Sequence, residues 1–422
     1  MKQSFLLIWR ALVRGHVLSL LLAVTALVHL LLPALVRSDG TAAGGREMYV
    51  RAVTGATYVL TVAVVLACAC GAFAQERAHA RLPLAMVRPA SAFGVACGAW
   101  LALCALAAAA LALTAALTWA RLPETPPCRH RHVPALPPAA EAARGQLAAY
   151  LADARTPEAV RKAPRAAVLR LLANKERERY DVVRPGAREA WPFPEALADA
   201  TGLVVRVRFA TPFDLRTPLA GVFTLGACAA VVSNCTQSVV EAGLARRGTG
   251  GAAAGAQRGA LAFENTGGEV VMLRPRRDLE ILAPADAYAA NLARAVLQML
   301  SLAALLAAFG LFLSAALSRP VALFTAFVSL AVALMAPSVV LQYPDALEAS
   351  LADRAGLAVA RALSFLAAPA EEAAPLAHLA TDVCIEWGAL ARSVLVNAVA
   401  LPLALLALAA ACARRRPLEN LS

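Results

Sequence analysis

Six long apolar stretches separate the polar parts of this chain. They lie at 17–36, 52–73, 93–118, 292–316, 320–342 and 391–412. A bilayer core of roughly 30 Å is crossed by about 20 apolar residues in a helix, so each stretch predicts a transmembrane helix. None has a charge near its centre, and Arg294 and Arg392 stand near stretch ends, where a long side chain can reach the headgroups. The first stretch exceeds the apolar core of a signal peptide, about 7–15 residues, so we expect it to be retained.

Composition agrees with a membrane protein. Hydrophobic residues make up 60% of the chain and charged residues only 16%, whereas about 25% of an ordinary soluble domain is charged. The net charge is +12, but the arginines sit at the ends of apolar runs or in one hydrophilic middle segment. A nucleic-acid-binding protein would instead gather basic residues and stacking aromatics in a polar domain. We therefore expect the chain to be embedded in a lipid bilayer, and we expect no nucleic acid as a partner.

Charges beside the apolar stretches predict the orientation. One set of short flanks carries ten basic residues against Glu76 and Glu419; they are Lys2, Arg10, Arg14, Arg77, Arg81, Arg88, Arg319, Arg414, Arg415 and Arg416. Cytoplasmic flanks carry the excess of Lys and Arg. Both termini are therefore expected in the cytoplasm, in a multi-pass protein of the cytoplasmic (inner) membrane, with the long segment after the third stretch outside.

This outer segment has a helical first part. A Pro-rich stretch from Pro123 to Pro138 is expected to form a linker. Of two helices expected after it, the second has Thr156 as a plausible N-cap, Pro157 at its first position and a break or restart at Pro164.

Short strands are expected in the second part of the outer segment. They are expected at 203–209, 221–233, 259–265, 269–274 and 279–282, with a hairpin turn at 265–268 and a flexible loop at 246–259. Several short strands at this spacing suggest an antiparallel β-sandwich.

The expected fold class is thus an α-helical polytopic membrane protein of about six transmembrane helices with an extracytoplasmic α+β domain. The first membrane half covers 1–118, the outer domain 119–290, and the second membrane half 291–422.

The candidate chemistry in this chain is sparse. No Gly-rich phosphate loop ending in Gly-Lys-Ser/Thr is present, so the chain cannot hydrolyse ATP by that route. Cys128, His130 and His132 form the only ligand-like cluster, but it sits in the Pro-rich linker without a third histidine. We expect no metal, no cofactor, no catalytic residue and no enzyme activity in this chain. The strand arginines could meet an acidic ligand, although a solvated sheet face explains them better.

Two further residue types leave alternatives open. Cys228 and Cys235 either pair as a disulfide or remain thiols. His29 is the one ionisable residue well inside a stretch, and we interpret it as a helix-packing group in preference to a proton carrier.

The segment between the second and third stretches (73–102) carries a resemblance to a known family. It resembles the coupling segment of ABC transporter permeases of the ABC-two class. The matching residues, in order, are Glu76, Arg77, Leu82, Leu84, Arg88 and Pro89. Residues 4–15 look like the family's interfacial elbow helix, and 343–390 look like its re-entrant helices. Two departures are Ala-His-Ala after the Glu-Arg pair and Val-Ala-Cys-Gly at the third stretch, where the family has Gly-Thr and Gly-Lys.

The resemblance implies the membrane-spanning permease subunit of an ATP-driven ABC transporter. Such a subunit would work as a homo- or heterodimer with a separate P-loop ATPase that docks on the coupling loop, 74–92. The alternative is a non-transporting envelope membrane protein, a sensor or scaffold whose outer β-domain binds a ligand or partner. The alternative predicts no obligate ATPase and a cytoplasmic loop that tolerates mutation.

Overall fold

The computed structural model describes most of the chain. The described residues are 1–36, 42–78, 91–122, 128–153, 155–162, 164–197, 200–209, 219–235, 239–246, 259–342, 356, 358 and 375–415. Two compact units are present. The first, the helical unit, joins Met1–Pro126 to Ala287–Ser422, and the second, the inserted unit, is Pro127–Asp286.

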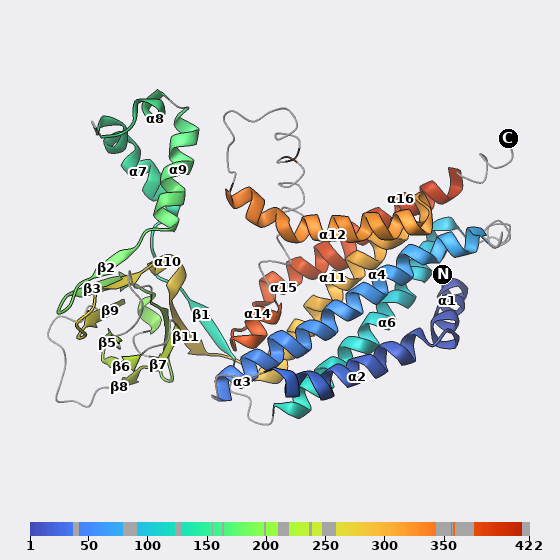
Figure 1. The fold of residues 1–422 in the computed structure, drawn as a ribbon, viewed down its shortest axis with the longest axis horizontal. Helices are drawn as coiled ribbons and strands as arrows, with labels where there is room; N and C mark the ends of the chain where they lie inside the picture. The colour runs from blue at the N-terminus through green and yellow to red at the C-terminus, as the bar shows by residue number, and fades with distance from the viewer. Residues whose placement is uncertain are drawn as a thin grey trace. The chain divides into compact units, whose positions relative to one another are not determined.

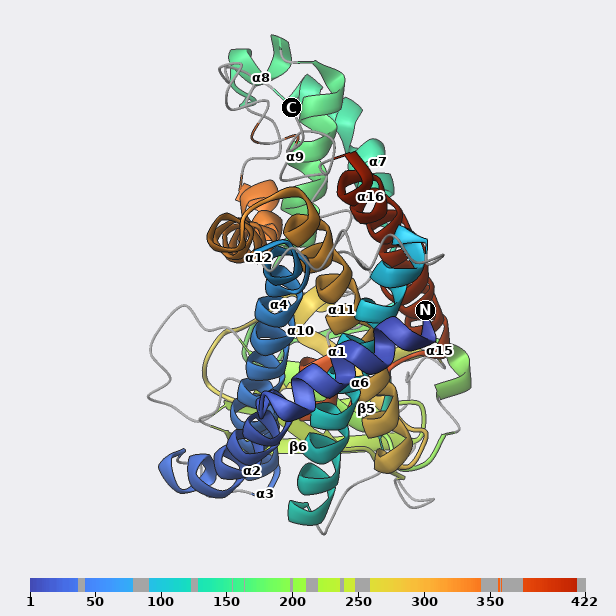
Figure 2. The same cartoon turned by 90° about the vertical axis from the view of Figure 1, so that its right-hand side faces the viewer.

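The helical unit is a bundle of long apolar helices that run side by side (Figures 1 and 2). Its elements are α1 (Lys2–Arg14), α2 (Val17–Leu35), α3 (Ala42–Tyr49), the π-helix η1 (Val50–Thr54), α4 (Gly55–Ala78), α6 (Ala92–Arg121), α11 (Tyr288–Ala316), α12 (Arg319–Gln342), α14 (Pro375–Ala380), α15 (Trp387–Ser393), the π-helix η3 (Val394–Ala400) and α16 (Leu401–Arg415).

Five helices in the described part of the chain are long and apolar enough to cross a membrane. They are Val17–Leu35, Gly45–Phe73, Ala92–Arg121, Tyr288–Ala316 and Trp387–Ala413, and they coincide with five of the six expected stretches. The remaining stretch falls on α12, where the apolar part with described side chains, Arg319–Val332, is shorter. The helices indicate a multi-pass membrane-embedded protein by their length and composition.

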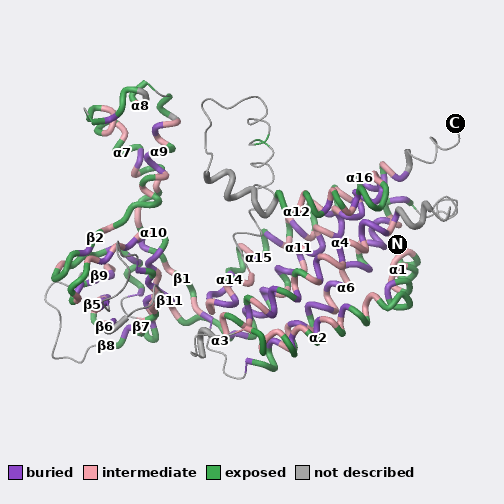
Figure 3. Tube along the Cα trace, in the orientation of Figure 1, coloured by how far each residue is buried: buried purple, intermediate pink, exposed green. Residues whose placement is uncertain are grey.

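Helix α11 lies at the centre of this bundle and packs against α4, α6, α12 and α16. Figure 3 shows it buried along most of its length, whereas α2 is exposed on one side. Small residues permit close approach of the helices. A Cβ on Gly310 would lie 2.6 Å from the Cβ of Ala69 in α4. The indole of Trp100 in α6 donates a hydrogen bond of 2.8 Å to the carbonyl of Ala304.

Helix α1 is separate from α2 and packs on α6. The chain turns between them at Gly15 and His16, and His16 has a left-handed φ of 58°. A Cβ on Gly98 would lie 2.7 Å from the carbonyl oxygen of Met1, so the missing side chain lets α1 approach α6 closely.

The inserted unit is built mainly from antiparallel strands. They are β1 (Arg129–His132), β2 (Asp181–Val183), β3 (Arg188–Pro192), β4 (Val204–Arg208), β5 (Leu219–Leu225), β6 (Cys228–Cys235), β7 (Val239–Gly243), β8 (Ala245–Arg246), β9 (Ala260–Asn265), β10 (Val271–Leu273) and β11 (Leu279–Pro284). They form a four-stranded sheet β1-β11-β4-β7, a five-stranded sheet β3-β9-β5-β6-β8 and the pair β10-β2.

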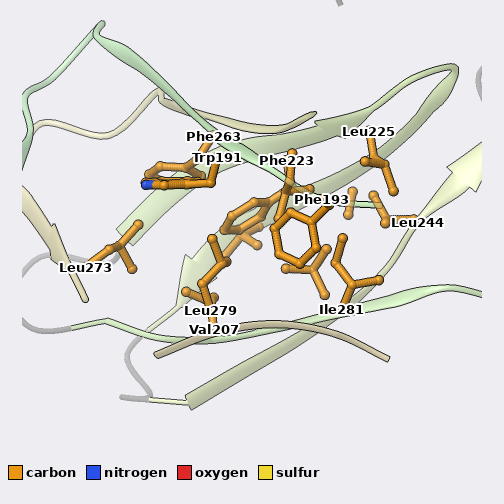
Figure 4. Close-up of a cluster of buried hydrophobic side chains, with 14 of the residues drawn as sticks. Trp191, Phe193, Val207, Phe223, Leu225, Leu244, Phe263, Leu273, Leu279 and Ile281 are labelled. Carbon is orange, nitrogen blue, oxygen red and sulfur yellow. The ribbon is translucent and has the colours of Figure 1, made fainter. Parts of the chain in front are cut away.

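All three sheets contribute to one hydrophobic core, drawn in Figure 4. Phe223 and Phe263 are opposite each other on β5 and β9, with ring centroids 4.6 Å apart. Ile281 on β11 and Leu273 on β10 belong to the same core and are fully buried. In β4 and β5 every second residue is buried, so one face of each strand points into this core.

The helices of the inserted unit are α7 (Ala139–Ala152), α8 (Glu158–Lys162), α9 (Arg165–Arg177), the short 3-10 helix η2 (Glu195–Leu197) and α10 (Pro275–Asp278). The expected restart at Pro164 is confirmed, since α9 begins at Arg165. The expected cap at Thr156 is wrong, because its hydroxyl donates to the carbonyl of Tyr150 and so ties down the end of α7.

Two strand-level expectations are wrong. The stretch 221–233 is not one strand, because it turns at Gly226, whose φ of 55° is the left-handed value that a two-residue II′ turn places on glycine. The Asn265–Gly268 turn is no hairpin, because β9 pairs with β3 and β5 while β10 pairs with β2. The amide of Asn265 instead donates to the carbonyls of Val183 and Glu269, and so joins the end of β9 to β2.

One expectation about the linker is wrong, and one open alternative for the cysteines is resolved. Residues 129–132, assigned from sequence to a Pro-rich linker, form β1 and pair with β11. Cys228 is a free thiol, so a Cys228–Cys235 disulfide is excluded. The expected loop, 246–259, lies outside the described residues except for its ends, Arg246 in β8 and Gly259.

Candidate functional site

A set of buried polar side chains lines one face of the central helix α11. Asn291, Arg294, Gln298 and Ser301 follow one another at spacings of three, four and three residues, which places them on one face of a helix. Each is at most 6% exposed. With Ser393 and Asn397 of the last helix they form a group that we call the polar ladder. Buried polar residues in a helix of membrane-spanning length mark functional positions, because they are costly there.

The first two rungs hold the chain that precedes α15. Asn291 donates to the carbonyl of Val383 and accepts from the backbone N–H of Ile385, both at 2.9 Å. Arg294 donates to the carbonyl of Ile385 and lies 4.5 Å from the ring of Trp387. The expectation that Arg294 extends toward headgroups is wrong, because its side chain packs inside the helical unit.

An ion pair anchors the same segment to α3. Arg46 lies 3.2 Å from the carboxylate of Asp382. Asp382 has a left-handed φ of 55°, a conformation that short polar residues tolerate better than most. Together with Asn291, this pair fixes the tight turn between α14 and α15.

The lower rungs form a directional hydrogen-bond chain. The amides of Gln298 and Asn397 both donate to the hydroxyl oxygen of Ser393. The hydroxyl of Ser301 donates to the carbonyl of Gln298, so it accepts from Ser393, 3.5 Å away. Every hydroxyl proton therefore has an acceptor, and Ser393 is the junction of the chain.

The last helix is distorted where it meets this junction. The π-helix η3 begins at Val394, directly after Ser393, and includes Asn397. A second π-helix, η1, precedes α4. π-Helical segments are rare in proteins, and those that occur often lie at functional sites. From Asn291 to Ser301 the ladder covers ten residues, or about 15 Å of helix, which is about half of a bilayer core.

Another polar pair lies between α2 and the residue before η1. The ring Nδ1 of His29 is 2.8 Å from the hydroxyl of Tyr49. His29 is 3% exposed. The pair favours the helix-packing interpretation of His29.

The strand arginines of the inserted unit meet carboxylates of the same sheet. Arg206 on β4 lies 2.7 Å from Glu241 on β7 and 3.9 Å from Glu280 on β11. Arg129 and Arg131 of β1 pair with Glu241 and Glu280 in turn. These three arginines therefore share two carboxylates of the sheet, whereas Arg208, further along β4, is exposed. Beside the sheets, Arg274 donates two hydrogen bonds to Asp278, and this contact raises the pKa of Arg274.

The residues that the family resemblance singled out lie mostly outside the described part of the chain. Glu76 and Arg77 belong to the last turns of α4, with side chains that are not described. Leu82, Leu84, Arg88 and Pro89 fall in the segment 79–90, outside the described residues. The re-entrant-like segment is described at 356, 358 and from α14 onward. Among the described residues, no group of three or more His, Cys, Asp or Glu could hold a metal ion.

The polar ladder was missed from the sequence, although a signal existed. Asn, Arg, Gln and Ser recur every three or four residues within an otherwise apolar stretch. Counting only charges near stretch centres passes over all four residues, because three are uncharged and Arg294 stands near the start of its stretch. Comparison with known proteins adds no family assignment: no family model, no curated protein and no solved structure matches this chain.

Proposed function

We propose that this chain is the membrane-spanning permease subunit of an ATP-driven ABC transporter and works with a separate P-loop ATPase. The ATPase would dock on residues 74–92, which include Glu76, Arg77 and the Leu82–Pro89 segment. Two permease subunits, identical or different, would line the substrate path between them. The proposal begins from the resemblance of 73–102 to the family's coupling segment.

The observation that carries the proposal is how the helices on either side of that segment pack. Helix α4 leads into it and α6 leaves it, and both are held tightly against α11. Gly310 brings α11 against Ala69 of α4, and Trp100 of α6 is hydrogen-bonded to the carbonyl of Ala304. A push on the coupling segment would therefore reach α11, and through the polar ladder the last helix.

The arrangement of charges supports a cytoplasmic position for the coupling segment. Arg319, at the start of α12, lies beside Gly71 near the end of α4, with its Nε 3.5 Å from the position of a Cβ there. Met1 lies beside Gly94 near the start of α6. Figure 1 shows the last turn of α16 at this same end of the bundle. The described flanks at Met1, at Arg319 and at the end of α16 thus lie at one end of the bundle, as expected of a cytoplasmic face under the positive-inside rule.

Disulfide-bonded cysteines support an outward position for the opposite end. Cys128 and Cys384 are both disulfide-bonded, and Cys384 lies two residues after Asp382, the partner of Arg46 in α3. Disulfides persist in oxidising compartments and not in the cytoplasm. We infer an inner-membrane protein with cytoplasmic termini and an inserted unit outside.

Affinity purification from gently solubilised membranes tests the proposal. We expect a protein with a P-loop motif to co-purify with the tagged wild type. It should be lost with Glu76→Ala/Arg77→Ala and when residues 82–88 are replaced by Gly and Ser.

A matched control uses Glu47→Ala/Arg51→Ala. This exposed Glu–Arg pair, 2.8 Å apart, has the same chemistry but lies in α3 and η1. The control should keep the ATPase. If no P-loop protein co-purifies with the wild type under conditions that preserve a known ABC complex, the transport proposal fails.

A further inference from the structure

Helices α7, α8 and α9 form a helical hairpin with an apolar core of its own. Ala143 of α7 packs with Val168, Leu172 and Ala173 of α9. The amide of Gln146 donates to Glu176 at 2.8 Å and joins the two long helices again. The hairpin is thus a compact element within the inserted unit.

The surface of this hairpin is strongly basic. Residues 139–179 contain five acidic residues and nine basic ones, all nine exposed, for a net charge of +4. The basic residues are Arg144, Arg155, Arg161, Lys162, Arg165, Arg170, Lys175, Arg177 and Arg179.

Internal ion pairs neutralise little of this charge. Glu158 pairs with Lys162 at 2.7 Å and Glu176 with Arg179 at 4.0 Å. Glu178 pairs with Arg274 and Arg277, which lie outside the hairpin. Within the described part of the chain, no carboxylate is in ion-pair distance of four of the exposed cations, which are Arg144, Arg155, Arg165 and Arg177.

An exposed apolar side chain accompanies the cations. Leu171 is 47% exposed on the outer face of α9. It stands next to Arg170 and one turn before Lys175. Binding to an anionic bilayer surface combines electrostatic attraction with contact by apolar side chains, and here the attraction of the cations is the larger part.

We propose that the α7–α9 hairpin is a docking surface for the anionic headgroups of membrane phospholipids. Connectivity favours lipid over a soluble acidic partner. The inserted unit continues at both ends into helices of membrane-spanning length, and 17 residues separate the end of α6 from the start of α7. The tether keeps a bilayer surface at high effective concentration, an advantage that a free protein lacks. The proposal needs the helical unit to sit in a membrane but does not depend on ATP-driven transport.

The test uses the full-length protein in nanodiscs of phosphatidylcholine alone or mixed with phosphatidylglycerol. Hydrogen–deuterium exchange of 139–179 is the readout. Each basic residue near an anionic surface strengthens attraction by about fivefold, so we expect slower exchange with phosphatidylglycerol that reverses at high salt. Replacing the four cations that lack a carboxylate partner with Gln lowers the hairpin charge from +4 to 0 and should abolish the effect.

The control variant also removes four positive charges, but from other parts of the inserted unit. Four exposed arginines are replaced by Gln in it: Arg184, Arg188, Arg208 and Arg246. This variant should retain protection by phosphatidylglycerol. Equal exchange in both lipids, equal loss in both variants, or equal protection by soluble polyglutamate would each overturn the proposal. None of these outcomes bears on ATPase co-purification.

Discussion

A single methyl group at position 310 tests the close packing of α11 on α4. A Cβ there would lie 2.6 Å from the Cβ of Ala69 and 3.2 Å from a methyl of Leu66. Carbon atoms in contact prefer about 3.5–4.0 Å. The helices would have to separate by about 1 Å, which would also loosen the neighbouring contacts of Gly310 along α4.

The size of the effect follows from two opposing terms. Overpacking a tight interior costs about 1–3 kcal/mol, whereas replacing Gly by Ala in a helix gains about 1 kcal/mol. Gly310→Ala should therefore destabilise the protein by up to about 2 kcal/mol, and the bulkier Gly310→Val by more. Gly388→Ala, in the same unit with no atom within 4 Å of the new Cβ, should cause no loss.

A double-mutant cycle isolates the contact. Thermal unfolding in a fixed detergent would be compared for wild type, Gly310→Ala, Ala69→Gly and the double variant. Ala69→Gly alone should cost about 1 kcal/mol through helix propensity. Combined with Gly310→Ala it should cost less, because it removes the methyl group that the new Cβ meets, giving a coupling of about 1 kcal/mol.

The reasoning would be refuted if Gly310→Ala behaved like Gly388→Ala and the coupling with Ala69→Gly were zero. The two helices would then not approach closely at this point. The proposed transmission from the coupling segment through α4 to α11 would lose its main structural support.

Two further substitutions test the two cores. Gly221→Val should destabilise the inserted unit by about 1–3 kcal/mol, because a Cβ there would lie 2.3 Å from the ring of Phe263. Limited proteolysis would measure the loss. Gly243→Val, with open space around its Cβ, should be neutral in that assay. Ser393→Ala should lower the thermal stability of the helical unit by about 1–3 kcal/mol, because two buried amide donors of the polar ladder lose their acceptor. The exposed Ser19→Ala should leave it within about 0.5 kcal/mol, and an equal effect of both would contradict the ladder's role.

The long helices were predictable because a membrane imposes a simple rule. An apolar run of about 20 residues has few alternatives to a spanning helix, and five of the six expected runs coincide with such helices in the described residues. The strands at β4, β9 and β11 were also found, because short alternating runs bounded by turn residues are local signals.

The errors came from information that is not local. The run 221–233 consists of small and apolar residues on both sides of Gly226, so its pattern did not reveal the reversal. The pairing of Val271 with Val183 joins segments nearly ninety positions apart, and no periodicity records such a partner. The hydroxyl of Thr156 donates to the carbonyl of Tyr150 in α7 and does not cap the following helix, α8. This contact depends on where α7 ends, which the local sequence around Thr156 does not show.

The internal bonding of the polar ladder bears on where a substrate would pass. Its upper rung is saturated by backbone groups of 383–385, and its hydroxyls at Ser301 and Ser393 donate within the ladder. A conducting path needs polar groups that exchange partners with the solute, whereas these groups hold two helices together. The ladder therefore suits transmission of movement between α11 and the last helix better than passage of a substrate through the subunit. If the chain is the proposed permease, this favours a path between two subunits, and the contact between α11 and the last helix offsets part of the cost of burying a polar face.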